Sequence, residues 1–250
     1  MKIEKLTILP GHGKHGIREE FEQLELRSGD IISIVGPTGS GKSQLLYDIE
    51  VLARGDTVSG RKVLLNGRLV PREEVMRPEF RLTGHVGQNL KFYLDLSVEE
   101  FLHLHAELFG TAVDVEKVLE TANMLTGEPI LPSMNLQELS GGQARALMIA
   151  DILLIRDSPI LLADEIENAG INKLAAMELF TQKKDRIVVF VTHDPVLALS
   201  SKLRIVMEAG AIKKIIITSE KERELLEEIK KDEKKLLELR EKIRKGEVLA

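Results

Sequence analysis

Residues 31–43 read IISIVGPTGSGKS, a short apolar run followed directly by a glycine-rich stretch. The run IISIV is typical of a buried strand, and GPTGSGKS (36–43) fits the pattern G-x-x-x-x-G-K-[ST]. Glycines in this pattern let backbone N–H groups turn toward phosphate oxygens at the start of a helix. The lysine reaches the β- and γ-phosphates, and the final hydroxyl suits Mg²⁺. We therefore expect residues 36–43, the phosphate loop, to bind a nucleotide through Gly36, Gly39, Ser40, Gly41, Lys42 and Ser43.

Strand-like and helix-like segments alternate along most of the chain. Strands are expected at 6–9, 21–26, 31–35, 62–65, 159–163, 187–191, 203–207 and 212–217. Helices are expected at 42–53, 97–109, 114–124, 142–155 and 172–182. The continuous apolar runs at 31, 160 and 187 are typical of strands covered on both faces. This order predicts an α/β fold in which a mostly parallel sheet lies between helices.

Two further strands end in polar side chains. PILLADE (159–165) ends in Asp164 and Glu165, and VTHD (191–194) places His193 after another strand. Ligands of open α/β sheets lie at the carboxyl ends of the strands. Asp164 is placed to hold Mg²⁺, Glu165 to polarise a water for attack on the γ-phosphorus, and His193 to bind the γ-phosphate or that water.

The stretch LSGGQARAL (139–147) opens another helix with a serine and two glycines. A hydroxyl, bare backbone amides and a helix dipole together suit an anion. With GPTGSGKS, PILLADE and VTHD in this order and spacing, the chain resembles the ATP-binding cassette (ABC) ATPases over roughly residues 1–217.

The resemblance implies ATP and Mg²⁺ as ligands and ATP hydrolysis as the reaction. In this family two subunits pair head to tail, and LSGGQ of one subunit covers the ATP held by the other. Ser140, Gly141, Gly142 and Gln143 would therefore contact the nucleotide of a second copy. Gln88 matches the family glutamine that senses Mg²⁺ and the attacking water, so we expect it beside Ser43 and Asp164.

The resemblance also implies a domain organisation. Residues 1–88 and 139–218 would form a P-loop NTPase core with an antiparallel β subdomain. Residues 89–138, which contain no convincing strand, would form an inserted helical subdomain. Residues 219–250 would form a charged C-terminal helix.

This chain departs from the family pattern at two sites. The family places an aromatic residue near Gly13 to stack on adenine, but LPGHGKHGI (9–17) offers only His12 and His15. Either histidine stacks on the base, or the stretch is a flexible glycine-rich turn with solvated histidines. DEIENAGIN (164–172) places Ile171 and Asn172 where the family has an aspartate that communicates across the dimer.

The C-terminal residues are mostly charged. Ile229, Leu236 and Ile243 recur every seven residues, Leu225 and Leu239 lie between them, and Asp232 interrupts the second apolar column. One interpretation is a solvated helix that packs this stripe back onto the body. The other is a paired helix or an arm that docks onto a partner.

Composition limits the remaining functions. The net charge of -5 argues against non-specific nucleic-acid binding, and the absence of cysteine excludes disulfides and Cys-ligated zinc. No apolar stretch approaches the length of a spanning helix, so we expect a cytoplasmic chain that does not insert into the membrane. Any membrane association would be peripheral, on the inner face of the cell membrane. The chain would serve a separate transmembrane permease as the ATP-binding subunit of a transporter. The alternative is a soluble ATPase that remodels or activates a partner protein.

Overall fold

The computed structural model describes residues 3–77, 82–87 and 91–247. Its strands are β1 (Lys5–Leu9), β2 (Leu24–Arg27), β3 (Ile31–Val35), β4 (Lys62–Leu65), β5 (Arg68–Leu69), β6 (Thr83–Val86), β7 (Ile160–Asp164), β8 (Ile187–Val191), β9 (Leu203–Glu208) and β10 (Ala211–Ile217). Its α-helices are α1 (Lys42–Glu50), α2 (Arg72–Val75), α3 (Val98–Phe109), α4 (Val115–Asn123), α5 (Gly141–Leu154), α6 (Lys173–Gln182), α7 (Pro195–Ser200) and α8 (Glu220–Arg244).

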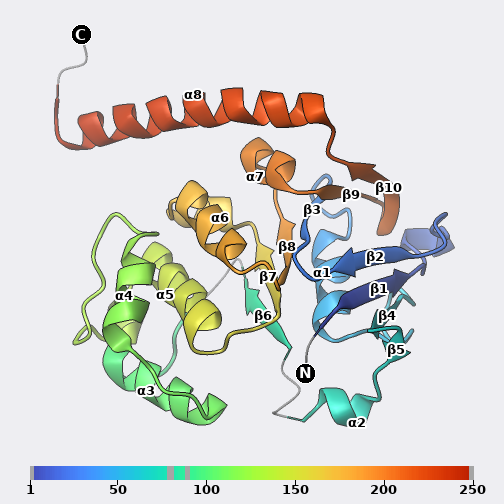
Figure 1. Ribbon diagram of the computed structural model, residues 1–250, viewed down its shortest axis with the longest axis horizontal. Coiled ribbons are helices and arrows are strands. Elements are labelled where there is room, and N and C mark those ends of the chain that lie inside the picture. The colour runs from blue at the N-terminus through green and yellow to red at the C-terminus, as the bar shows by residue number, and fades with distance from the viewer. Residues whose placement is uncertain (1–2, 78–81, 88–90, 248–250) are drawn as a thin grey trace.

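Two sheets form the centre of the molecule (Figure 1). One has the order β10-β9-β3-β8-β7-β6 and is parallel except for β10, which pairs antiparallel with β9. The other has the order β2-β1-β4-β5 and is antiparallel. Both the α/β class and the antiparallel β region predicted from the sequence are therefore confirmed.

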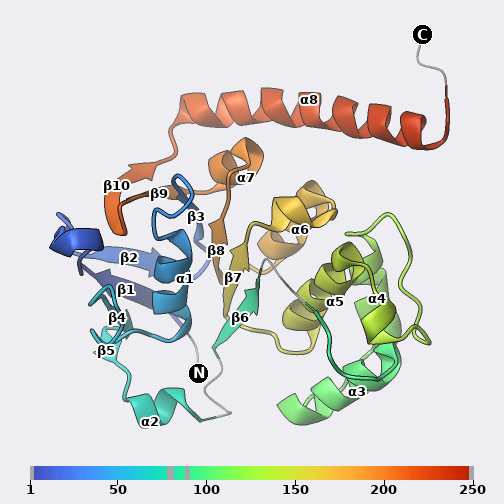
Figure 2. The ribbon, with the colours of Figure 1, turned by 180° about the vertical axis from the view of Figure 1, so that it is seen from behind.

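Alternate residues of the parallel strands face two separate hydrophobic cores. Ile160 and Leu162 of β7 pack with α1 and the antiparallel sheet, whereas Leu161 and Ala163 pack with the helices on the other side. Because side chains of a strand alternate between faces, the uninterrupted apolar run at 160–163 has a partner on each side. Figures 1 and 2 show the resulting layers, with α1 between the two sheets and α5 and α6 on the opposite face of the large sheet.

Four short elements were not predicted from the sequence, namely α2, α7, β5 and β6. β6 escaped because its four residues include Gly84 and His85, which weaken a strand signal. The glycine has a packing role, since an added Cβ at Gly84 would lie only 2.4 Å from Cγ2 of Ile152 on α5. The glycine that lets β6 pack closely against α5 is therefore also the residue that weakens the strand pattern in the sequence.

Residues 91–138 hold α3 and α4, as predicted, and no strand is assigned within them. α3 begins at a capping box in which Ser97 and Glu100 bond each other's backbone N–H, and it ends at Gly110 in the left-handed conformation. α4 begins after the cap Asp114. The predicted boundary between core and helical subdomain, at 88/89, lies outside the described residues.

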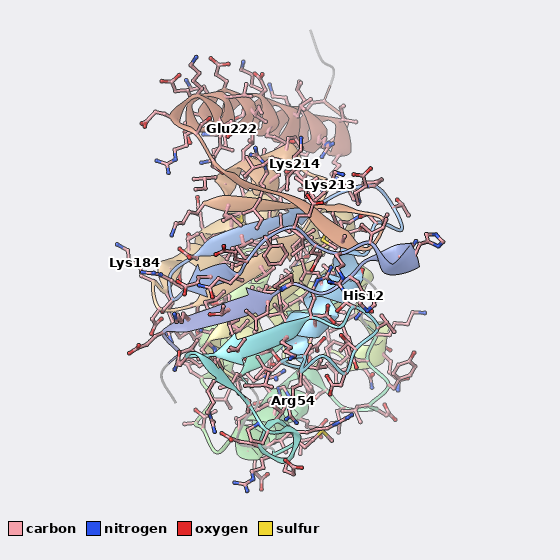
Figure 3. The ribbon with its side chains drawn as sticks, turned by 90° about the vertical axis from the view of Figure 1, so that its right-hand side faces the viewer. His12, Arg54, Lys184, Lys213, Lys214 and Glu222 are labelled. Atoms are coloured by element: carbon pink, nitrogen blue, oxygen red, sulfur yellow. The ribbon has the colours of Figure 1, made fainter. Side chains whose placement is uncertain are left out.

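α8 lies across one end of the molecule, over α7 (Figures 1 and 3). The face that contacts the body contains Leu226, which is 7% exposed, and the half-buried Glu233 and Leu237. Glu222 pairs with Arg204 of β9, and Glu233 pairs with Lys173 of α6 at 2.8 Å. The prediction that the apolar stripe of α8 packs onto the body is therefore wrong. The ion pairs turn a different face of the helix inward and leave most side chains of the stripe exposed.

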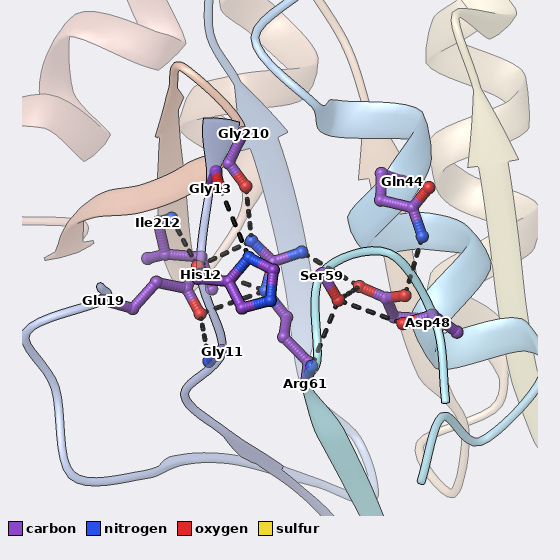
Figure 4. Close-up of polar contacts among 11 residues, drawn as sticks. Gly11, His12, Gly13, Glu19, Gln44, Asp48, Ser59, Arg61, Gly210 and Ile212 are labelled. Atoms are coloured by element: carbon purple, nitrogen blue, oxygen red, sulfur yellow. Dashed lines mark hydrogen bonds and ion pairs between the residues drawn. The ribbon is translucent and has the colours of Figure 1, made fainter. Parts of the chain in front are cut away.

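A buried ion network joins the two sheets to α1 (Figure 4). Arg61, which precedes β4, has no exposed side-chain surface and contacts Glu19 at 2.6 Å and Asp48 of α1 at 2.9 Å. Its guanidinium also donates to the carbonyl of Gly210, between β9 and β10, at 2.8 Å. Burial alone would lower the pKa of Arg61, but the hydrogen bonds and charges of Glu19 and Asp48 raise it above its ordinary value.

Arg61→Ala is expected to lower the free energy of unfolding by about 3–5 kcal/mol, because two buried carboxylates lose their counter-ion. Urea unfolding of the nucleotide-free protein measures the loss. The control is Arg68→Ala in β5, whose pair with Glu74 is largely exposed; the expected loss there is about 0–1 kcal/mol. Equal losses in the two variants would contradict a central role for Arg61.

Candidate functional site

The phosphate loop connects β3 to α1, as the sequence predicted. Gly41 has φ +97°, and an added Cβ there would lie 2.8 Å from Cα of Gly210, so only glycine fits. Lys42 is buried, and its ammonium donates to the carbonyls of Gly36 at 2.9 Å and Pro37 at 3.2 Å. The positive charge therefore lies inside the curve of the loop, where a phosphate would meet it.

Ser43 and Asp164 face each other across the end of the large sheet. Ser43 Oγ donates to Oδ2 of Asp164 at 3.4 Å, although the residues are 121 positions apart. Burial raises the pKa of the Asp164 carboxyl above its ordinary value, and the neighbouring charge of Glu165 adds to the shift. A cation at this point would offset both effects.

Glu165 and His193 also meet at this sheet edge. His193 Nε2 lies 3.3 Å from Oε1 of Glu165. Glu165 has a left-handed backbone with φ 48° and ψ 48°, which is uncommon for a non-glycine residue and turns the chain sharply after β7. The structure thus brings together the two side chains that the sequence assigned to water activation and phosphate binding.

Sequence reasoning missed Glu167. Its Oε1 accepts from the hydroxyl of Thr192 and from the backbone N–H of His193, each at 2.7 Å. Glu167 therefore ties the turn that carries Glu165 to the strand end that carries His193. Its one signal in the sequence is the stretch DEIENAGIN, which departs from the family pattern.

Gln88, predicted as a catalytic and Mg²⁺-sensing residue, lies outside the described residues. Among the described residues, no group of three or more His, Asp or Glu is arranged to hold a metal ion. A Mg²⁺ site at Ser43 and Asp164 would not need three such side chains. Mg²⁺ in nucleotide sites takes most of its ligands from phosphates and water.

The stretch LPGHGKHGI lies beside the phosphate loop, since Lys14 Nζ donates to the carbonyl of Gly39 at 3.0 Å. It also lines a cavity of about 700 Å³. An added Cβ at Gly13 would lie 2.5 Å from the carbonyl oxygen of Ala209, and one at Gly11 would lie 2.1 Å from that of Ser59. Neither glycine position therefore admits a side chain.

Both histidines of this stretch are exposed. The ring of His12 packs against Gly60, where an added Cβ would lie 3.2 Å from Nε2. His15 is exposed and has φ 58° within a short 3₁₀ turn.

The LSGGQ stretch begins α5. The Ser140 hydroxyl accepts from the N–H of Gln143 at 3.3 Å, and Oε1 of Gln143 accepts from the N–H of Ser140 at 3.0 Å. Gln143 also donates to the carbonyl of Pro129 at 3.3 Å, so its side chain builds the helix tip. An added Cβ at Gly141 would meet nothing within 4 Å, so the tip is open to an approaching ligand.

α5 and α1 lie in different parts of the molecule, on opposite sides of the large sheet (Figures 1 and 2). The predicted nucleotide contacts of Ser140, Gly141, Gly142 and Gln143 therefore do not converge with the phosphate loop of the same chain. The separation agrees with the expectation that a second copy supplies one of the two elements.

The second departure from the family pattern also has a local explanation. Ile171 is 8% exposed and packs into the core with the helices. The Asn172 side chain accepts from the N–H groups of Leu174 and Ala175 and thereby caps α6. Both side chains therefore make their contacts within their own subunit, one in the core and one at the helix cap.

None of the described helices combines the length and apolar character needed to cross a membrane. The family model for ABC transporter proteins matches residues 22–168. An uncharacterized ABC transporter ATP-binding protein of Methanocaldococcus jannaschii is 49% identical over 251 residues, covering 100% of this chain and 96% of that protein.

More distant relatives include the maltose/maltodextrin import ATP-binding protein MalK of Yersinia pestis, 29% identical over 77% of this chain. The chain spans 52% of the length of that protein. Among solved structures, a dimeric bacterial ABC transporter cassette matches with a TM-score of 0.65 and 25% identity over 86% of this chain and 99% of that one. The chain therefore belongs to the ABC transporter family and is one of its ATP-binding ATPases.

Proposed function

We propose that two copies of this chain bind two MgATP molecules between them, head to tail, and separate after hydrolysis. The observation that carries this proposal is the meeting of Ser43 with Asp164 and of Glu165 with His193 beside the phosphate loop, at 3.4 and 3.3 Å. The LSGGQ tip lies elsewhere and is open, so a second copy must supply it. The dimeric cassette among the similar structures supports this arrangement.

In this mechanism the phosphate loop holds the β- and γ-phosphates through its N–H groups and Lys42. Ser43 and Asp164 supply hard oxygen ligands suited to Mg²⁺, which when bound neutralises charge on the phosphates. Glu165 polarises the attacking water, and His193 donates to the γ-phosphate. Glu167 keeps the backbone of His193 at the correct distance from Glu165.

The γ-phosphate acts as the switch, because Ser140 and the glycines of the opposite subunit contact it only in the closed dimer. Loss of this group on hydrolysis removes the contact, and the dimer opens. We infer that opening and closing drive a separate transmembrane permease. The import and transporter names of the relatives support this role over the activation of a soluble partner.

Glu165→Gln is expected to abolish ATP turnover and leave an ATP-bound dimer that elutes as such in gel filtration. Glutamine keeps the size of the side chain and removes its basicity. Lys42→Ala is the matched control, because it should lose nucleotide binding and therefore form no ATP-dependent dimer. If Glu165→Gln elutes identically with and without MgATP, the head-to-tail dimer is wrong.

Asp164→Asn is expected to raise the Tm of the nucleotide-free protein at neutral pH and to abolish Mg²⁺-dependent hydrolysis. The folded-state pKa of Asp164 is raised, so its charged form destabilises the fold above that pKa, and the cost disappears as the pH falls through it. The gain in Tm should therefore shrink at acid pH. Asp185→Asn, at an exposed turn, should leave Tm unchanged within error. A lower Tm for Asp164→Asn at neutral pH would contradict the analysis.

ATP and GTP are expected to bind with dissociation constants within about tenfold of each other, which is about 1.4 kcal/mol. A stacked aromatic ring contributes about 1–3 kcal/mol per base, and the stretch LPGHGKHGI contains no Phe, Tyr or Trp to supply one. Competition of each nucleotide against a fluorescent ATP analogue on Glu165→Gln measures the ratio. A preference for ATP well beyond tenfold would show that His12 or His15 reads the base.

A further inference from the structure

The exposed flank of α8 carries a row of residues at heptad spacing. This heptad row consists of Leu225, Ile229, Asp232, Leu236, Leu239 and Ile243. Four of its apolar members are well exposed, at 47% for Leu225, 49% for Leu236, 41% for Leu239 and 60% for Ile243. Large apolar side chains repeated along one flank of a charged helix are costly to leave in water.

The helix cannot bury this row by rolling on its own subunit. Glu222 is held by Arg204, and Glu233 by Lys173, which also binds Asp194. These contacts fix the inward face of α8. By helical geometry the heptad row points roughly 100° away from that face, so it lies along the side of the helix.

The charges of α8 are divided unevenly along its length. Residues 220–232 carry six acidic and four basic side chains, whereas residues 233–245 carry three acidic and six basic ones. We propose that the heptad row pairs with the heptad row of a second copy of this chain, with the two α8 helices antiparallel. Each acidic half then lies against a basic half.

The residues that flank the row favour the antiparallel orientation. In a parallel pair, Glu228 would face Glu233 of the second copy, and Lys235 would face Arg240, so both contacts join like charges. In an antiparallel pair centred near residue 234, Glu228 faces Lys242 of the second copy at both ends, while near the axis Lys235 meets Lys235 and Glu233 meets Glu233 of the second copy. The antiparallel pair therefore gains two opposite-charge contacts that offset its like-charge contacts at the axis, whereas the parallel pair has only like-charge contacts among these residues.

The apolar residues match in the same register. Leu225 lies opposite Ile243 of the second copy, and Ile229 lies opposite Leu239, once at each end of the pair. Asp232 falls near the two-fold axis, opposite Leu236 of the second copy, and it already binds Lys235 of its own helix at 3.2 Å. A polar residue at one such position specifies register at some cost in affinity.

This contact does not need nucleotide, which separates it from the ATP-dependent dimer. The row spans fewer than three heptads, so the pairing is weak and reversible on its own. Its role in the ATPase cycle rests on the proposed function. The α8 pair would hold the two subunits near each other while the nucleotide sites are open, and so raise the effective concentration of one subunit around the other for the next closure.

Sedimentation equilibrium of the full chain without nucleotide, over a concentration series, tests the pairing. The wild-type chain and Lys42→Ala are expected to self-associate with the same Kd. Leu236→Gln combined with Leu239→Gln should raise this Kd at least about tenfold, because the contact of Leu239 with Ile229 is lost at both ends of the pair and the centre of the row becomes polar. A wild-type chain that stays monomeric throughout would overturn the proposal.

The matched control is Lys231→Gln combined with Lys234→Gln, which places glutamines on the other flank of α8. This pair should leave the Kd within about threefold of wild type, a difference of under 1 kcal/mol. Circular dichroism checks that both double variants keep their helix content. Equal losses in the two variants, or a row variant that associates like wild type, would rule out the row as the contact.

Orientation is tested by disulfide formation, since the chain has no cysteine of its own. Under mild oxidation, Leu225→Cys mixed with Ile243→Cys should give a cross-linked heterodimer, and each variant alone should give almost none. Efficient cross-linking of each variant to itself would show a parallel pair and overturn the proposed orientation. Capture of only an unrelated protein by the row would overturn self-pairing altogether.

The two kinds of dimer fail independently. If the head-to-tail dimer is wrong, Glu165→Gln gains nothing from MgATP while the nucleotide-free Kd is unchanged. If the α8 pairing is wrong, the double variant Leu236→Gln and Leu239→Gln has the same nucleotide-free Kd as wild type, whatever the ATP-dependent result.

Discussion

A guanidinium group with no exposed surface lies where the two sheets and α1 meet. Arg61 binds Glu19, which follows the histidine-containing stretch, and Asp48, which lies on the helix that begins at the phosphate loop. It also binds the carbonyl of Gly210, and the N–H of Gly210 bonds Ser40 in that loop at 2.8 Å. The surroundings of the triphosphate and of the base are therefore positioned by one buried cation. Breaking such a pair costs far more than its net contribution suggests, because the partner charges stay buried.

The same close packing explains why positions 11 and 13 carry glycine. Gly13 lies against the backbone of Ala209 and Ala211, which belong to the turn that Arg61 fixes. A side chain at position 13 would push this turn away from the phosphate loop. Under the proposed function, we expect the binding affinity for nucleotide to come mainly from Lys42, the loop N–H groups and the bound cation.

The central strands and the phosphate loop could be predicted from the sequence because their signals are local. IISIV, PILLA and IVVFV are apolar throughout, and the loop glycines stand at fixed spacing. β6 was missed because Gly84 is present for contact with α5, and Glu167 was missed because its partners, Thr192 and His193, are distant in sequence. The inward face of α8 was also mispredicted. Apolar periodicity identified the heptad row, but the ion pairs of Glu222 and Glu233 decide which face contacts the body.

Lys173 connects α8 to the edge of the large sheet where Glu165 and His193 lie. It follows the cap Asn172 and binds both Glu233 of α8 and Asp194, the residue after His193. Asp194 in turn accepts from the N–H groups of Val196 and Leu197 and caps α7, the helix beneath α8. α8 is therefore fixed to the strand end that carries His193, and not only to the surface of the subunit. A contact made through α8 is mechanically joined to the catalytic site, which a mobile charged tail could not achieve.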